Sequence, residues 1–449
     1  MTEPDQKHLI AIADHALDLA RRNGADQADV VIAESTSLSA SVRLGALEDV
    51  ERAEDRELGL RVFTGHSQAI VSTTDFSAKS LETLAERAVA MARIAPPDEH
   101  SGLADPDELA ADWPDLDLRD AAAPDAEALQ ARALEAEDAA RAVDGVTNSE
   151  GAGAGYGLIG VVLATSTGFC GAYRRTGYGI SCSALAGEGT GMERDHDSAS
   201  AVHYADLDDA AAIGRRAGER AVRRLSPRKV SSQTVPVVYD PRVSRSLLGH
   251  LAGAISGTAI TRGTSFLKDR MGDQVFAPGI AIVDAPLRPR GLRSRPFDGE
   301  GIAGHSREIV SDGRLQTWVL DCYSARRLGL RTTGHASRGA SSSPSPSVTN
   351  LSLMPGPLSP EALIGEIPSG LYVTELMGMG VNGVTGDYSR GASGFWIENG
   401  EIAYPVSEIT IAGNLKDMFA SLAPADDLVY RYGVDAPTCR VEAMTIAGT

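Results

Sequence analysis

ELMGMGVNGVTGDYSRGASGFWIENGEIAYPVSEITIAGN, from Glu375 to Asn414, is the stretch that decides the fold of the C-terminal half. It contains Asn399-Gly400, a dipeptide typical of a two-residue hairpin turn, between two strand-like segments. Upstream, EIVSDGRLQTWVLD has Asp312-Gly313 in the same position between two strands. These turns predict a strand-dominated domain over residues 231–449, which begins with the strand TVPVVYD and a helix from Ser244 to Ile260.

The chain before this domain divides into two α/β units. The first, residues 1–97, opens with apolar residues at helical spacing from Gln6 to Asn23. It ends with a helix that Ser77 caps and the Pro96-Pro97 pair stops. Between these helices, β-branched residues predict strands in ADVVIAES, LSASVRLG, LGLRVFTG and SQAIVSTT.

The second unit, residues 98–230, opens with an acidic, proline-bearing segment that runs to Pro124. Its composition predicts a solvated linker. A helix from Asp125 to Val143, three strands within residues 155–189 and a helix from Leu207 to Leu225 are expected to follow. The predicted fold class is therefore α+β, with N-terminal α/β units before a β-rich C-terminal domain.

Composition excludes several classes of protein. With 61 acidic against 42 basic residues and a net charge of −19, the chain would repel a phosphate backbone, so we expect no nucleic-acid partner. The N-terminus lacks the basic region of a signal peptide, and no apolar run approaches the roughly 20 residues of a membrane span. Four separated cysteines form no CxxC pair. We expect a soluble, cytoplasmic protein without membrane contact.

The common hydrolytic motifs are missing from the sequence. His250, in LLGHLAGAISGTAI, is the helix-borne histidine nearest to such a setting, but Leu251 follows it where a zinc peptidase motif needs glutamate. Residues 252–256 offer no second ligand, so His250 is interpreted as a packed or partner-facing side chain. There is no G-x-S-x-G elbow, and the glycine clusters lack the ending of a phosphate loop. We therefore predict no catalytic residue and no metal ligand in this chain.

One alternative metal site remains open from the sequence. His305 and His335 each follow a glycine in a predicted loop, and with a distant carboxylate they would form a zinc site. Such a site would make the chain an autonomous metallopeptidase. The Ser/Pro-rich segment from Ser337 to Ser347 is expected to be a mobile surface loop.

The glycine-rich stretch is the candidate peptide-binding site. Glycines let a ligand approach the backbone, and an extended peptide can add itself to such a strand edge. The polar residues set among these glycines are Glu375, Asn382, Asp387, Tyr388 and Arg390. The same residues would equally suit a structural loop held by local hydrogen bonds, and the sequence leaves both interpretations open.

Long segments of the C-terminal half resemble one known family. They include RSLLGHLAGAISG, RGTSFLKDRMG, RPFDGEG, YSARRLGLRTTGHA, the block from VTELMGMG to NLKDM and the terminal MTIAGT. They are similar to the TldD/PmbA family, and most of all to its PmbA (TldE) branch. The likeness is dense from about Thr234 onward and weaker, though colinear, before it.

The resemblance implies a cytoplasmic zinc metallopeptidase complex that processes or degrades small, unstructured peptides. Its working unit resembles a heterodimer in which the TldD-type subunit holds zinc with an H-E-x-x-x-H helix and a downstream cysteine. If the matching helix is aligned on RGTS, Leu248-Gly249 stands at the His-Glu pair and Gly253 at the second histidine. If it is aligned on His250, Leu251 and Ile255 stand at the remaining positions. Cys439 is offset from the family's cysteine. No ligand position carries over.

We therefore expect a PmbA/TldE-type, non-catalytic partner of a TldD-like subunit, with a barrel-like C-terminal domain and zinc held only in the partner. The helix of His250 and the loop from Gly378 to Phe395 are the candidates for the surface that faces the shared cavity. The other open interpretation, besides an autonomous enzyme, is a non-enzymatic homodimer that binds peptides.

Overall fold

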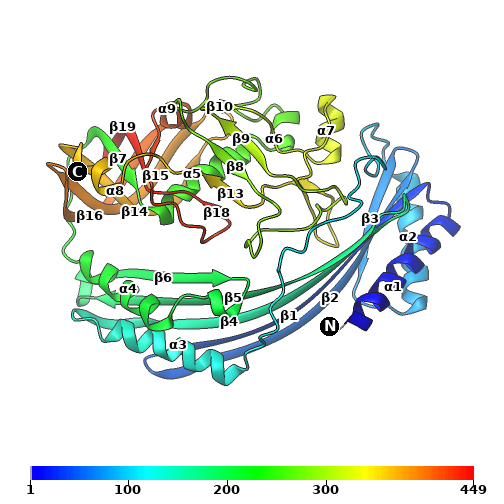
Figure 1. Cartoon of the computed structure of the whole chain (residues 1–449), viewed down its shortest axis with the longest axis horizontal. Coiled ribbons are helices and arrows are strands. Elements are labelled where there is room, and N and C mark those ends of the chain that lie inside the picture. The colour runs from blue at the N-terminus through cyan, green and yellow to red at the C-terminus, as the bar shows by residue number, and fades with distance from the viewer. Residues whose placement is uncertain (1–2, 449) are drawn as a thin grey trace.

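The computed structural model describes residues 3–448, which form a long curved sheet beneath a β-rich C-terminal domain (Figure 1). The sheet has six strands, and all neighbours in it are antiparallel. In spatial order they are β3 (Ser67–Thr73), β2 (Ala46–Thr64), β1 (Gln27–Arg43), β4 (Val146–Thr165), β5 (Cys170–Ala186) and β6 (Glu193–Ala201). The two predicted N-terminal units thus share one sheet.

Two pairs of helices pack at opposite ends of this sheet (Figure 1). The pairs are α1 (Glu3–Arg22) with α2 (Ala78–Ile94), and α3 (Ala126–Arg141) with α4 (Ala210–Arg223). Even-numbered residues of β1 face the helices: Ile32 packs with α1 and α2, and Ala40 packs with α3 and α4. Because side chains alternate along a strand, odd-numbered residues such as Val31 face the other way, where Phe297 of the C-terminal domain covers them.

The strands are longer than predicted. ADVVIAES and LSASVRLG form one strand, β1, because its middle residues pair with both β2 and β4. The acidic residues 46–57, which carry no strand signal, extend β2 along β1. Pairing partners thus override weak local propensity here.

The segment before Pro124 is not a solvated linker, so that prediction was wrong. Leu103, Leu116 and Leu118 in it are buried, and the Ala110 N–H donates to the Gly301 carbonyl of the C-terminal domain at 2.8 Å. Most of its acidic residues, such as Asp105 and Asp112, are exposed, while these three leucines are buried. The average charge of the segment hid this alternation.

The C-terminal domain contains a closed barrel of five strands, as predicted. Their order is β16 (Glu401–Asn414), β15 (Asp387–Glu398), β14 (Ser369–Val381), β7 (Gln233–Tyr239) and β19 (Cys439–Ala447). The barrel closes because β19 pairs back onto β16, and the short β17 (Ala423–Pro424) extends β19. Asn399 and Gly400 have φ of 52° and 81°, which confirms the predicted hairpin turn between β15 and β16.

A second, smaller sheet packs beside the barrel. Its order is β10 (Arg314–Leu315), β9 (Arg307–Ser311), β8 (Ile282–Asp284), β13 (Leu351–Leu353) and β18 (Val434–Asp435). The predicted Asp312-Gly313 turn joins β9 to β10, with φ of 47° and 72°. Three short helices of the domain are α7 (Cys322–Leu328), α8 (Pro360–Gly365) and α9 (Leu415–Ala420).

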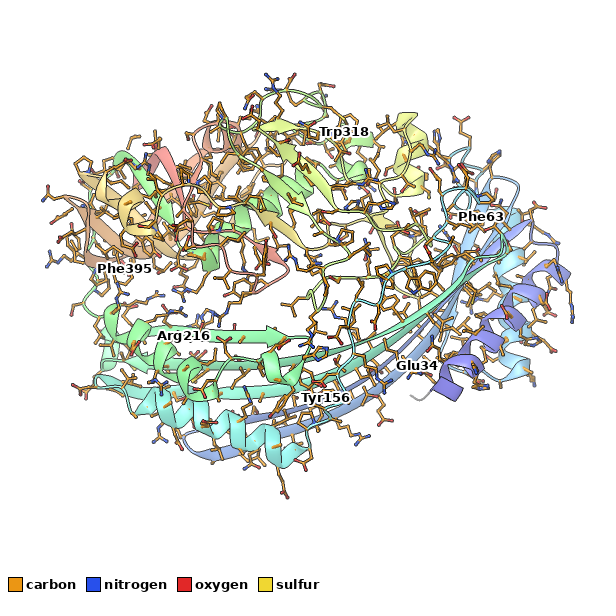
Figure 2. The ribbon with its side chains drawn as sticks, viewed as in Figure 1. Glu34, Phe63, Tyr156, Arg216, Trp318 and Phe395 are labelled. Atoms are coloured by element: carbon orange, nitrogen blue, oxygen red, sulfur yellow. The ribbon has the colours of Figure 1, made fainter. Side chains whose placement is uncertain are left out.

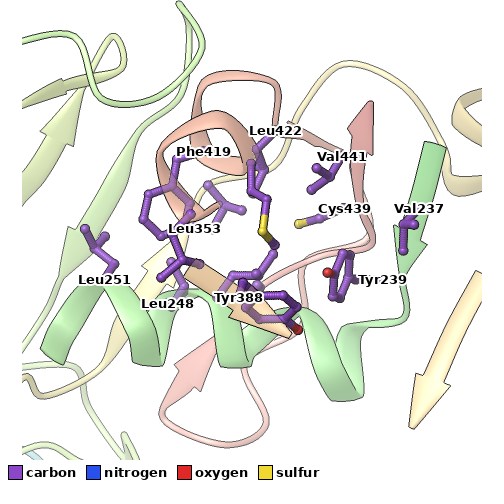
Figure 3. Close-up of a cluster of buried hydrophobic side chains, with 14 of the residues drawn as sticks. Val237, Tyr239, Leu248, Leu251, Leu353, Tyr388, Phe419, Leu422, Cys439 and Val441 are labelled. Atoms are coloured by element: carbon purple, nitrogen blue, oxygen red, sulfur yellow. The ribbon is translucent and has the colours of Figure 1, made fainter. Parts of the chain in front are cut away.

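The helix predicted from Ser244 to Ile260 is two helices, α5 (Pro241–Ala254) and α6 (Gly257–Thr261). The break falls at Ser256, which forms a bridge with Val319, and the Gly257 N–H donates to the Val319 carbonyl at 2.8 Å. Leu248 and Leu251 of α5 enter the largest core, together with Tyr388 and Cys439 from the barrel (Figure 3).

The Ser/Pro-rich segment is anchored to the sheet rather than extended into solvent. Its ends pair as β11 (Ala336–Ser337) and β12 (Ser345–Pro346). Arg338 and Ala340 between them are buried. A side chain at Gly59 of β2 would clash with the Ala340 carbonyl oxygen, 1.7 Å from an ideal Cβ. The prediction of a free surface loop is therefore wrong for these residues.

No helix within residues 3–448 combines the length and the apolar character that crossing a membrane requires.

Candidate functional site

A pocket of about 330 Å³ lies between α5 and the glycine-rich β14–β15 hairpin. The segment after α6 and the first residue of α9 complete its wall. The lining residues are Gly249, His250, Gly253, Ala254, Thr264, Phe266, Met379, Val381, Gly383, Arg390 and Leu415. The pocket therefore joins the helix and the loop that the sequence proposed for one cavity-facing surface.

The local sequence explains how α5 presents this face. Asp240 caps the helix, and its side chain accepts a hydrogen bond from the Arg242 N–H at 2.9 Å. The apolar residues Leu248 and Leu251 face the core on the opposite side. An ideal Cβ on Gly249 or Gly253 would meet no atom within 4 Å, so these glycines leave open space and are not required by packing.

His250 is half-buried at the pocket wall. Its Nε2 atom is buried and has no hydrogen-bond partner, and its ring lies edge-on to Tyr388 with 5.8 Å between centroids. Burial, and then the positive charge of Arg390, lower the pKa of His250. The imidazole is therefore neutral at pH 7. Tyr388 itself is buried behind it, and that burial raises the pKa of its phenol.

Arg390 supplies the positive charge of the pocket. It projects from β15, and its Nε donates a hydrogen bond to the Met377 carbonyl on β14 at 3.1 Å. This bond orients the planar guanidinium at the pocket wall. Of the described residues 3–448, those that line the pocket include no Asp or Glu. The site is thus cationic and otherwise largely apolar.

Asn382 and Asp387 hold the hairpin turn together. The Asn382 side-chain oxygen accepts a hydrogen bond from the Val384 N–H at 2.9 Å. The Asp387 carboxylate accepts from the Thr385 hydroxyl at 2.6 Å and from the Asn414 amide at 3.1 Å. These hydrogen bonds lower the pKa of Asp387. Both residues shape the loop beside the pocket without lining it.

Glu375 lies elsewhere, at the contact between the barrel and the N-terminal sheet. Its carboxylate pairs with Arg224 at 2.6 Å, just after α4, and with Arg194 on β6 at 3.8 Å. Phe395, on the side of the domain that faces α4, carries the Arg223 guanidinium 5.1 Å from its ring centroid (Figure 2). The structure therefore brings Arg390 and His250 into one pocket, with Tyr388 behind them, and places Glu375 in a structural ion pair.

The residues of the pocket do not fit a zinc ion. In either alignment to the family's zinc helix, the ligand positions carry leucine, isoleucine or glycine, and Leu248 and Leu251 point into the core. Arg390 adds a cation where a metal would need anionic ligands. Cys439 is fully buried, its Sγ lies 3.2 Å from the Pro437 carbonyl, and burial raises its pKa.

The two loop histidines do not form an alternative site. His335 is buried, its Nδ1 lies 2.8 Å from the Thr333 carbonyl and its Nε2 lies 3.6 Å from Asp284. His305 is exposed. Over residues 3–448, no three His, Cys, Asp or Glu side chains gather in a metal-binding group.

The sequence proposed the two main elements of this pocket, but not the residues that complete its wall. Gly249 and Gly253 are four residues apart and therefore share one helix face, which is the signal that was available. Phe266 and Met379 line the same pocket from distant segments, and no local pattern connects them.

Comparison with known proteins identifies the class. Residues 28–92 match PmbA/TldA metallopeptidase domain 1, residues 119–225 the central domain and residues 232–448 the C-terminal domain. The chain is 39% identical over 451 residues to the Escherichia coli O157:H7 protein named Metalloprotease PmbA, covering 99% of this chain and 97% of that one.

Solved structures agree with this fold. A crystal structure from Bacteroides thetaiotaomicron VPI-5482 has a TM-score of 0.90 at 29% identity and covers 100% of both chains. TldE from Thermococcus kodakarensis has a TM-score of 0.86, covering 97% of this chain and 100% of that one, and its 20% identity supports the fold alone. The matched regions define a three-part fold of the metallopeptidase class. The chain belongs to the PmbA/TldE family of metalloprotease-like proteins.

Proposed function

We propose that this chain is the non-catalytic PmbA/TldE-type subunit of a TldD/TldE-like metallopeptidase complex. The observation that carries the proposal is the pocket beside α5. It is lined by α5, the helix that corresponds to the family's zinc helix, yet the pocket presents glycines, a neutral imidazole and a guanidinium in place of metal ligands. In this proposal the pocket holds part of a peptide, and another subunit supplies the metal that activates water.

In this proposal the TldD-like subunit holds the zinc, which polarises a carbonyl and supplies activated water. The present chain contributes Arg390 and the apolar wall of its pocket, which position part of an extended, unstructured peptide in a shared cytoplasmic cavity. Positioning of this kind accelerates a reaction because the peptide no longer loses its freedom of motion in the reacting step.

A reconstituted cleavage assay tests this role. An unstructured, quenched fluorescent peptide is incubated with this chain, with a TldD-like subunit, and with the mixture, each with added zinc and with a chelator. The proposal predicts no cleavage by this chain alone and chelator-sensitive cleavage in the mixture that exceeds the rate of the TldD-like subunit alone.

Two results would overturn the proposal. Chelator-sensitive cleavage by the pure chain would make it an autonomous enzyme. Peptide binding that no partner changes, without cleavage in the mixture, would instead identify a peptide-binding homodimer.

A further inference from the structure

We propose that the pocket beside α5 binds the free carboxyl end of a peptide, with Arg390 pairing with the terminal carboxylate and the last side chain, an apolar one, filling the cavity. This inference rests on the proposed function for the origin of the peptide, because it names which part of the substrate this subunit holds.

The charge of the pocket points to an anion. Arg390 donates one hydrogen bond from Nε to the Met377 carbonyl, which favours one orientation of the guanidinium before a ligand arrives. A guanidinium in this orientation recognises a planar carboxylate through charge-assisted hydrogen bonds. Since no Asp or Glu of the described chain lines the pocket, the ligand is the counter-charge that the site lacks.

His250 adds a second unsatisfied group. Its Nε2 atom is buried without a hydrogen-bond partner, which is unfavourable for a polar nitrogen in the folded protein. The neutral ring can donate one hydrogen bond, but Nε2 has no exposed surface, so it reaches a carboxylate oxygen only if the ring turns toward the pocket. Arg390 therefore carries the recognition of the carboxylate.

The remaining wall explains why the carboxylate is a chain terminus rather than an acidic side chain. Phe266, Val381 and Leu415 present apolar surface in the same small cavity as Arg390. A C-terminal residue with an apolar side chain places a carboxylate and a hydrocarbon group on the same carbon atom. Met379 is 90% exposed at the irregularity of β14 between Met377 and Gly380, where it can cover the residue once bound.

The size of the cavity is sufficient for the terminal residue. A volume of about 330 Å³ exceeds that of one large amino-acid side chain and leaves room for part of the residue before it. Gly249 and Gly253 provide this space, because side chains there would project into it. The rest of the peptide would extend out of the pocket.

The test measures peptide binding to the full chain alone by fluorescence anisotropy. Three N-terminally labelled hexapeptides share one sequence: one ends in leucine with a free carboxylate, one ends in leucine amide, and one ends in glutamate amide. The free acid should bind about tenfold or more tightly than the leucine amide, since a charged hydrogen-bonding pair is lost in the amide. The glutamate amide should bind as weakly as the leucine amide.

Three variants locate the site. Arg390→Gln should remove the preference for the free acid. Gly253→Leu should abolish binding by filling the pocket, while its unfolding temperature stays equal or rises because leucine favours a helix more than glycine does. Arg52→Gln, a matched change at an exposed arginine on β2, should bind like the wild type.

Equal binding of acid and leucine amide, no peptide binding at all, or an acid preference that survives Arg390→Gln overturns the inference. Tight binding of the glutamate amide overturns the assignment to a chain terminus. None of these outcomes depends on cleavage. A selective pocket in a chain that fails to stimulate a TldD-like subunit would therefore refute the proposed function and leave this inference standing.

Discussion

Removing the charge of Asp29 should destabilise the protein strongly, because this carboxylate joins the N-terminal sheet to the C-terminal domain. It is 1% exposed, and it accepts hydrogen bonds from Arg61 on the neighbouring strand and from Arg338 in the anchored segment, the latter at 2.7 Å. Both arginines are themselves buried. Asp29→Asn keeps the shape of the side chain but leaves two buried guanidinium groups without a counter-charge.

The expected loss is about 3–5 kcal/mol of unfolding free energy, the range measured when one partner of a buried ion pair is removed. Arg338→Met should cost less, because Asp29 stays paired with Arg61 through an Nε hydrogen bond of 3.0 Å. The matched surface control is Glu54→Gln, which breaks an exposed pair with Arg52 and should change stability by no more than about 0.5 kcal/mol.

Urea unfolding followed by tryptophan fluorescence measures these values. Trp113 reports on the junction itself, because its ring packs 4.9 Å from that of Phe297. A loss below about 1 kcal/mol in Asp29→Asn, or an equal loss in Arg338→Met, would refute the view that this carboxylate neutralises two buried cations.

Three further predictions address buried and exposed groups. Burial, and then the charge of Asp298, raise the pKa of Glu300 from 4.5 to about 7. Between these two pH values the folded state keeps a proton that the unfolded state releases. The free energy of unfolding therefore falls as pH rises through this range, by up to roughly 3 kcal/mol. Glu300→Gln should remove this loss in urea unfolding at pH 5 and pH 7.5, and an unchanged pH dependence would contradict the assignment. Gly59→Ala should lower the free energy of unfolding by about 2 kcal/mol or more, because its methyl group meets the Ala340 carbonyl; an unaltered urea midpoint would show that the anchored segment moves aside. Of the four cysteines, only Cys170 is exposed, so a thiol reagent should titrate one group in the native protein and four in urea, and rapid reaction of more than one native thiol would contradict the packing.

Local signals explain what the sequence predicted well. The Asn399-Gly400 and Asp312-Gly313 turns are correct because both residues of each turn adopt positive φ, a preference set by the dipeptide itself. The strand-rich C-terminal domain follows from such turns. The prediction of no zinc site in α5, in contrast, rested on the leucines and glycines that stand at the family's ligand positions.

Long-range contacts explain what the sequence did not predict. Residues 46–57 look like a charged loop, and only pairing along β1 makes them a strand. Glu375 was interpreted as a ligand-binding residue within a glycine-rich stretch, but it pairs with Arg224, which directly follows α4 in the N-terminal half of the chain. Arg390 acquires its pocket only when α5 packs against the hairpin. The strand pairing of residues 46–57 and the ion pair of Glu375 leave no periodic or spaced pattern in the chain.

The most direct test of the central claim is a titration. Chelator-sensitive cleavage of an unstructured peptide by a fixed amount of TldD-like subunit is measured as this chain is added. We expect that the rate rises and saturates near one chain per TldD-like subunit, while this chain alone cleaves nothing. A rate that is as high without this chain as with it would contradict the account.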